Sequence, residues 1–380
     1  MNSSLRFVLK LVPLAGLALL AGCGPKDGLK DYAAGMQAYE VRDLKRAERC
    51  FAESLKEAPN AVNTLVMFAR VELDLGEIAA AKEAIARAVA LEAEASDVAM
   101  LAAEVAYQAK DYAAAVKGFE SVIAREKENP AMQALAWTGI GIVEMTCDRR
   151  DFARLAFLRA IRLDRRNAAA RYHLGLLYRG DAYGYLDAAL EQLQIYVRLE
   201  TEDARRVQDT LRTLIPALRE DIARRAAECP GVERRNAEVS AAALLKAETA
   251  WKKGTFKTAR VEYDKAYAAD PLSYPAALGL AKAWEQTDAT ESGRIKALSY
   301  YQAACLLRPN AVSTFLTAGS LAMKLGRWAS AAEFYSRAVA ANPNDLTALD
   351  GLIRALRKVG GKEEVAAAYQ QYRETIPVRK

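Results

Sequence analysis

The sequence predicts an all-α fold assembled from repeated pairs of helices. Small residues recur along the 380-residue chain at a dominant interval of 34 residues. Within each interval a large apolar residue follows an alanine by four positions, which places both on one face of a helix. Prolines close several of the intervals. One helix pair cannot bury its apolar face alone, so this pattern indicates a stack of pairs that share a continuous core.

Three series of residues carry the repeat. Small residues in the first half of each repeat are Gly35, Ala69, Ala103, Gly141, Gly175, Ala247, Ala281 and Gly319. Alanines in the second half are Ala47, Ala81, Ala115, Ala153, Ala189, Ala259, Ala297 and Ala331. Prolines at the ends are Pro59, Pro271, Pro309, Pro343 and Pro377. We expect buried wedges on the second helices at Phe51, Ile85, Phe119, Phe157, Leu193, Tyr263, Tyr301, Tyr335 and Tyr369.

The repeats also share local text. GTFKTARVEYDKAYAADP (254–271) matches GRWASAAEFYSRAVAANP (326–343) at its glycine, aromatic, alanine and proline positions. The glycine that ends a first helix suits a left-handed C-cap. This pattern resembles the tetratricopeptide repeat, a 34-residue helix-turn-helix unit. The resemblance covers residues 28 to 379 and implies a right-handed α-solenoid whose first helices line a concave, partner-binding side.

The resemblance divides the chain into two arrays. The expected units are 28–61, 62–95, 96–129, 134–167, 168–203, 240–273, 274–311, 312–345 and 346–379. The N-terminal array is therefore 28–203 and the C-terminal array 240–380. Residues 204–239 fit the pattern poorly and are either a degenerate helical unit or a spacer. The unit 274–311 carries an insertion around TDATESGR, residues 287–294.

The N-terminus has the layout of an export signal. Arg6 and Lys10 precede the apolar run LVPLAGLALLAG, residues 11–22, which is shorter than the ~20 residues of a spanning helix. Leu20, Ala21, Gly22 and Cys23 resemble the lipobox of bacterial lipoproteins. The resemblance implies removal of the signal peptide 1–22, acylation of Cys23 with fatty acids such as palmitate, and a short lipidated tether, 23–27. The alternative is an ordinary signal, or a short membrane helix, with an incidental cysteine.

The residue after Cys23 bears on location. In Gram-negative lipoproteins an aspartate there favours retention at the inner membrane, whereas this chain has Gly24. In such a host, we expect a cell-envelope protein that is lipid-anchored at the periplasmic face of the outer membrane.

No catalytic site is expected, and no cofactor, metal or small-molecule substrate. The one histidine, His173, lies in a repeat helix without a recognisable Ser or Cys partner motif. No phosphate-binding or zinc-binding motif is present in the sequence. Cys50, Cys147, Cys229 and Cys305 are expected to be buried free thiols, although export would permit disulfides.

Two surfaces are candidates for binding. The groove implied by the resemblance takes Tyr32, Met36, Tyr39, Arg70, Met100, Tyr107, Thr138, Met145, Tyr172, Arg179, Trp251, Lys252, Lys282, Met323, Lys324, Arg354 and Arg357. Aromatic residues, Met and Arg are enriched in interfaces, but packing against a neighbouring unit is an equal alternative. A basic patch is expected at Arg149, Arg150, Arg154, Arg159, Arg162, Arg165 and Arg166, as a solvated face or as a dock for an acidic partner or lipid headgroups.

These features favour a non-catalytic scaffold or adaptor that binds partner peptides or helices. The expected partners are other cell-envelope proteins, with a membrane contact through the lipid and no nucleic acid, since the net charge of +6 is mild. The alternative is a periplasmic chaperone that holds exported clients in the groove. An enzyme ranks third.

Overall fold

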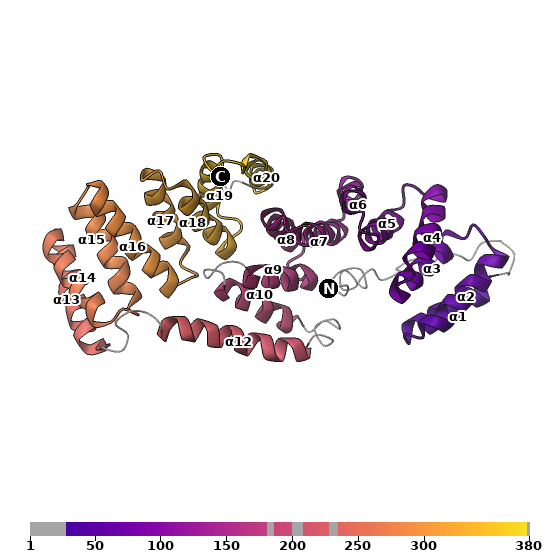
Figure 1. Cartoon of the computed structure of the whole chain (residues 1–380), viewed down its shortest axis with the longest axis horizontal. Helices are drawn as coiled ribbons and strands as arrows, with labels where there is room; N and C mark the ends of the chain where they lie inside the picture. The colour runs from indigo at the N-terminus through magenta and orange to yellow at the C-terminus, as the bar shows by residue number, and fades with distance from the viewer. Residues whose placement is uncertain (1–27, 181–185, 200–207, 228–234, 378–380) are drawn as a thin grey trace. The chain divides into compact units, whose positions relative to one another are not determined.

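The computed structural model describes residues 28–180, 186–199, 208–227 and 235–377. The predicted signal peptide, the lipobox with Cys23, and Cys229 lie outside these ranges. Within them the chain forms 19 helices and no strand, which confirms the predicted all-α class (Figure 1).

The helices follow one another in pairs. The first five pairs are α1 (Leu29–Glu40) and α2 (Leu44–Glu57), α3 (Val62–Leu75) and α4 (Ile78–Leu91), α5 (Ser96–Gln108) and α6 (Tyr112–Arg125), α7 (Pro130–Thr146) and α8 (Arg150–Leu163), and α9 (Ala168–Gly180) and α10 (Leu186–Arg198). After the single helix α12 (Gln208–Ala227) come α13 (Ala237–Lys252) and α14 (Phe256–Ala269), α15 (Tyr274–Thr287) and α16 (Glu291–Leu307), α17 (Val312–Lys324) and α18 (Trp328–Ala341), and α19 (Leu346–Leu356) and α20 (Glu363–Glu374).

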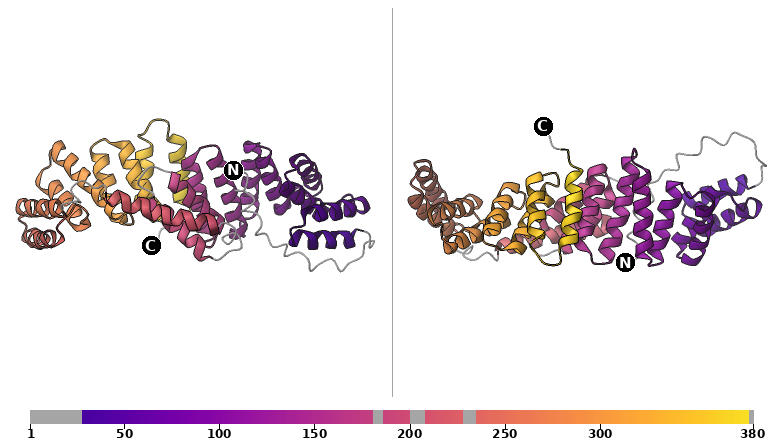
Figure 2. Two further views of the ribbon diagram at one scale, coloured as in Figure 1. Left: turned by 60° about the horizontal axis from the view of Figure 1, so that its bottom comes forward. Right: turned by 90° about the horizontal axis from the view of Figure 1, so that it is seen from above.

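Packing divides the chain into two compact units, which meet in sequence between His173 and Leu174. In the first unit, α1 to α8 pack in order, each against the next. In the second, α10 packs on α12, and α13 to α20 pack in order, as the two further views in Figure 2 also show. Helix α12 carries Pro216 in its interior and stands alone rather than in a pair within the described chain. The division into arrays at 28–203 and 240–380 remains a prediction about sequence repeats.

The core consists of large wedge residues set against small ones. Each of the nine predicted wedges is buried, and so is each small residue of the first series. The alanines of the second series have no exposed surface. A Cβ atom built on Gly35 would lie 2.7 Å from Cε1 of Phe51, so only glycine lets α1 approach that ring. The ring of Tyr335 lies in the same way against Gly319 of α17 and Gly351 of α19.

The turn between the helices of a pair uses a left-handed residue. Gly76, Gly254 and Gly326 have φ values of 91°, 74° and 68°. This confirms the predicted left-handed glycine at the end of a first helix. Other repeats place a side-chain-bearing residue in this conformation, as at Lys110, where φ is 63°. Such residues carry a steric cost that glycine avoids.

Replacing Lys110 with glycine should therefore stabilise the protein. We expect Lys110→Gly to raise the free energy of unfolding by about 1 kcal/mol and Gly76→Ala to lower it by about the same amount. Urea denaturation of the purified proteins measures both changes. The control is Lys117→Gly in the middle of α6, which should cost about 1 kcal/mol. If Lys110→Gly destabilised the protein as much as Lys117→Gly does, the backbone account would be wrong.

A methyl group at Gly351 should disrupt the wedge. The opposite edge of the Tyr335 ring lies close to Gly319 of α17, which leaves the ring little room to move away from a new methyl group. We expect Gly351→Ala to lower the free energy of unfolding by about 1–3 kcal/mol through overpacking, despite the higher helix propensity of alanine. Gly360→Ala is the matched control, since a Cβ atom there would meet nothing within 4 Å. Thermal denaturation that gave equal shifts for the two variants would contradict the wedge.

Candidate interaction surface

Most predicted groove residues lie at the surface of first helices. Met100 and Thr138 are exceptions and were wrongly predicted, since they are 1% and 0% exposed. Met100 is buried in α5, and the Thr138 hydroxyl donates a hydrogen bond of 2.7 Å to the carbonyl of Ala134. The remaining groove residues are half-buried or exposed. The exposed ones are Arg179, Lys252, Lys282, Lys324, Arg354 and Arg357.

In the first unit these polar side chains link neighbouring pairs. The Tyr39 hydroxyl donates to Oδ2 of Asp74 at 3.2 Å, and Arg42 pairs with the same oxygen at 2.7 Å. Burial and then the negative charge of Asp74 raise the pKa of Tyr39 to about 12, so its phenol remains a donor. Tyr39 thus serves to fasten α1 to α3.

The same kind of link recurs along the first helices. Arg70 of α3 lies 3.7 Å from the carboxylate of Glu104 on α5. The hydroxyls of Tyr107 on α5 and Thr146 on α7 are 3.0 Å apart. The predicted groove residues Arg70 and Tyr107 therefore have partners within the chain. This favours packing against a neighbouring unit, rather than partner binding, for this part of the surface.

The second unit contains an open pocket of about 410 Å³. Its lining residues are Trp251 of α13, Lys282, Glu285 and Gln286 of α15, Ala289 in the turn before α16, Arg294 in the first turn of α16, and Lys324 of α17. The structure thus brings together the predicted groove residues Trp251, Lys282 and Lys324. It adds Glu285, Gln286, Ala289 and Arg294, which the sequence analysis did not place there.

The charges in this pocket are unbalanced. Lys282, Arg294 and Lys324 face a single carboxylate, that of Glu285. Lys324 Nζ lies 3.7 Å from Oε1 of Glu285, and the Tyr301 hydroxyl donates to Oε2 at 3.1 Å. Burial, followed by the charge of Glu285, raises the pKa of Tyr301, so the phenol stays protonated and fixes the carboxylate.

Aromatic contacts set the pocket walls. The indole of Trp251 packs edge-on against Phe256, with ring centroids 4.9 Å apart. On α15, Trp284 lies beneath the Arg260 guanidinium at 4.2 Å and the Lys296 ammonium at 4.5 Å from its ring centroid. These cation–π contacts join α15 to α14 and α16. Helix α15, which supplies three of the seven lining residues, is therefore held by two neighbouring helices.

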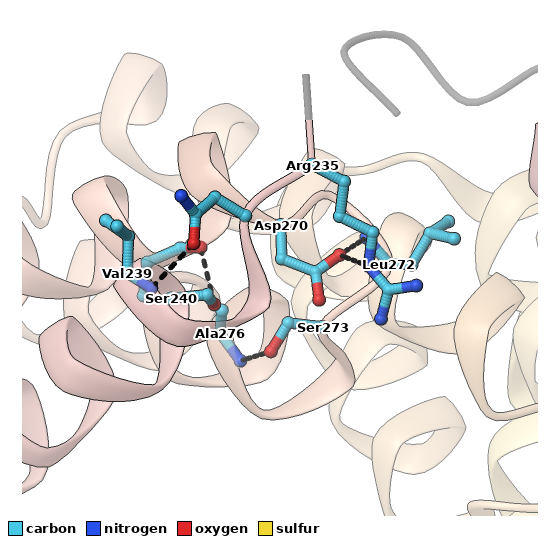
Figure 3. Close-up of polar contacts among 9 residues, drawn as sticks. Arg235, Val239, Ser240, Asp270, Leu272, Ser273 and Ala276 are labelled. Carbon is cyan, nitrogen blue, oxygen red and sulfur yellow. Dashed lines mark hydrogen bonds and ion pairs between the residues drawn. The ribbon is translucent and has the colours of Figure 1, made fainter. Parts of the chain in front are cut away.

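The start of α13 is held by a buried carboxylate. Asp270, which is 5% exposed, accepts from Nε of Arg235 at 2.8 Å and from the backbone N–H of Leu272 at 3.1 Å. Figure 3 shows Arg235 reaching Asp270 from the segment before α13. This contact ties that segment to the turn between α14 and α15.

Two further bonds complete the attachment. The backbone N–H of Asn236 donates to the carbonyl of Ala269 at 2.7 Å, and the Ser240 hydroxyl donates to that of Ala266 at 2.9 Å. Because α13 is fixed at its start by these bonds and at its end by the packing of Trp251, the pocket wall is pre-formed.

Removal of the Asp270 carboxylate should loosen this attachment. We expect Asp270→Ala to lower the free energy of unfolding by about 1–3 kcal/mol, because two donors lose a buried acceptor. Asp264→Ala, at an exposed position of α14, should change it by less than about 0.5 kcal/mol. Urea denaturation of both variants checks the difference. Equal stabilities would show that the carboxylate does not hold α13.

The predicted basic patch is not one exposed cluster. Arg154 is buried, 6% exposed, and pairs with Asp151 at 3.2 Å, so its assignment to a surface patch was wrong. Asp151 lies one turn earlier on α8 and supplies the counter-charge that makes burial tolerable. Arg149 pairs with Glu144 at 2.9 Å, and the Arg159 guanidinium lies 4.4 Å from the Trp137 ring centroid.

The rest of the predicted patch is mixed. Arg150 and Arg162 are half-buried, whereas Arg165 and Arg166 are exposed just after α8. The backbone carbonyl of Arg165 accepts a hydrogen bond from the Arg171 guanidinium at 2.8 Å. Most of these arginines therefore contribute to packing around α8, and the exposed pair is a small remnant of the expected surface.

The residues considered for chemistry lie in varied surroundings. His173 is fully buried and stacks on Phe157, with ring centroids 5.8 Å apart. The three cysteines in the described residues are free thiols. Cys305 is buried and Cys50 half-buried, but Cys147 is exposed, contrary to prediction, because it caps the end of α7 rather than lying inside it.

Two searches over the described ranges gave negative results. No group of three or more His, Cys, Asp and Glu side chains among these residues is placed to hold a metal ion. None of the described helices combines the length and the apolar character needed to cross a bilayer.

Comparison with known proteins agrees with this geometry. Residues 66–136 and 316–377 match the family model for the tetratricopeptide repeat. No curated protein matches the chain.

Among solved structures, the similarities cover part of the chain. A thermophilic tetratricopeptide repeat protein of Thermus thermophilus is 22% identical, with a TM-score of 0.42 over 50% of this chain and 98% of that one. PilF of Pseudomonas aeruginosa is 14% identical, with a TM-score of 0.41 over 66% and 95%. MamA of Desulfovibrio magneticus is 18% identical, with a TM-score of 0.39 over 47% and 97%. The repeat assignment rests on the family model and on the helix pairs described above.

Proposed function

We propose that this chain, a tetratricopeptide repeat protein, is a non-catalytic scaffold or adaptor that is lipid-anchored in the bacterial cell envelope. Its first helices present a surface to peptides or helices of other envelope proteins. The pocket between α13, α15 and α17 is part of that surface.

One observation carries the proposal. The pocket brings three cationic side chains and an indole from three successive helix pairs around one concavity of about 410 Å³. Concave sites with an apolar wall and a few convergent polar groups are typical of ligand binding. The corresponding polar groups of the first unit are instead joined to one another, as in the Arg70–Glu104 pair.

The anchor is supported by the sequence alone. Cys23 follows a short apolar run and three residues typical of a lipobox. Several acyl chains on this cysteine would hold the protein stably at a membrane, since each buried CH₂ adds about 0.8 kcal/mol. The absence of an aspartate after Cys23 favours the periplasmic face of the outer membrane.

In-cell crosslinking tests the adaptor role. The full-length protein is captured from detergent-solubilised envelopes, and the proteins joined to it are identified and quantified. We expect one or two stoichiometric envelope proteins, lost or redistributed in Cys23→Ala because the anchor places the protein beside them. A Lys282→Glu/Lys324→Glu variant should recover at least tenfold less of the partner, since both cations line the pocket.

The control is Lys257→Glu, which makes the same charge change at an exposed position of the second helix α14. It should recover as much partner as the unmodified protein. A broad set of exported clients, without a stoichiometric partner, would overturn the adaptor proposal in favour of the periplasmic chaperone.

A further inference from the structure

We propose that the pocket binds an acidic segment of a partner protein, and that Glu285 competes with this segment for Lys324. The inference rests on the proposed function and specifies the ligand of the same site. It also assigns to Glu285 the role of setting the affinity.

The first argument is charge complementarity. Three cations and one carboxylate line the pocket. Lys282 is exposed and Arg294 half-buried, and neither forms an ion pair or side-chain hydrogen bond with another described residue. Side chains of like charge around one concavity raise the local concentration of the opposite charge. Carboxylates of an incoming chain would meet cations that are already in place.

The first unit supplies the contrast. There Arg42, in the turn after α1, and Arg70 of α3 lie beside Asp74 and Glu104, at 2.7 and 3.7 Å. These cations are neutralised by the neighbouring helix pair. In the second unit the same surface keeps an excess of positive charge, so an acidic ligand is selected at the pocket rather than along the whole chain.

The second argument is the shape and chemistry of the walls. Trp251 is half-buried and braced by Phe256 and Tyr263, with ring centroids at 4.9 and 6.4 Å. Its remaining surface offers a rigid apolar contact beside the cations. A volume of about 410 Å³ holds a few side chains and excludes a folded domain. The fitting ligand is therefore an extended or helical segment that places an apolar side chain next to two or more carboxylates.

The third argument concerns Glu285. One of its oxygens lies 3.7 Å from Lys324, while the other accepts from Tyr301. The Glu285 carboxylate competes with an acidic ligand for Lys324, and its negative charge repels the carboxylates of the ligand. Glutamine at this position can still accept from Tyr301, so the geometry is kept while the negative charge is lost. The substitution should strengthen binding of an acidic ligand.

Fluorescence anisotropy tests the inference. The probe is the fluorescein-labelled hexapeptide Leu-Glu-Glu-Leu-Glu-Glu, compared with Leu-Gln-Gln-Leu-Gln-Gln at low and high salt. We expect binding of the glutamate peptide only, weakened by salt because the pocket is open to solvent. Glu285→Gln should tighten it by about two- to fivefold, the range for a partly exposed ion pair. Lys282→Glu and Lys324→Glu should each weaken it by about tenfold or more.

Two matched controls accompany these variants. Lys257→Glu and Glu248→Gln repeat the charge changes at exposed positions of α14 and α13 that do not line the pocket. Both should leave the dissociation constant within about twofold of the original, since they lie outside the pocket. Equal binding of the glutamine peptide, or an equal loss in Lys257→Glu, would overturn the inference.

If Glu285→Gln bound the glutamate peptide with unchanged affinity, Glu285 would not set the affinity of the pocket. A stoichiometric partner captured by a protein that does not bind the glutamate peptide would overturn the inference and leave the adaptor role standing. Binding of the glutamate peptide without any stoichiometric partner would overturn the adaptor role and leave the specificity of the pocket for an acidic ligand standing.

Discussion

The packing of one large side chain against small residues is the interaction on which the rest of this molecule depends. A wedge such as Tyr335 fills the space between the helix before it and the helix after it, and Gly319 and Gly351 leave room for its ring. Because a wedge of this kind joins two successive pairs, burial accumulates along the chain rather than at one centre. Closely packed protein interiors tolerate little change in side-chain volume. The size of the small residue opposite a wedge therefore fixes the spacing between the helices.

This division of labour leaves the outer face of each first helix free to vary. The small residues and the wedges form the core, while other residues of the first helices reach the surface. In the first unit those surface positions carry opposite charges and form ties between pairs, as Arg70 and Glu104 do. In the second unit, Lys282 and Lys324 gather with one carboxylate around an indole. The same scaffold thus carries paired charges in one region and an excess of positive charge in another.

Sequence periodicity predicted the helix pairs, the buried wedges and the left-handed turn glycines, because each follows from local spacing. It did not predict which surface residues have partners. Thr138 is buried because its hydroxyl finds a carbonyl one turn earlier, and Arg154 because Asp151 neutralises it. Such pairings depend on side-chain geometry that no repeat pattern records. Trp251 and Lys324 were placed in the groove from their helix positions, but their convergence on one pocket required the packing of α13, α15 and α17.

The pocket also depends on a departure from the repeat. Ala289 and Arg294 belong to the insertion around TDATESGR, residues 287–294, between α15 and α16. Here the Thr290 side chain caps α16 by accepting from the backbone N–H of Gly293 at 3.2 Å, which sets the first turn that carries Arg294. Insertions in repeat arrays extend one face of the molecule, and this one adds the third cation to a site whose other members come from regular positions. The proposed binding pocket thus lies where the sequence departs from its regular period.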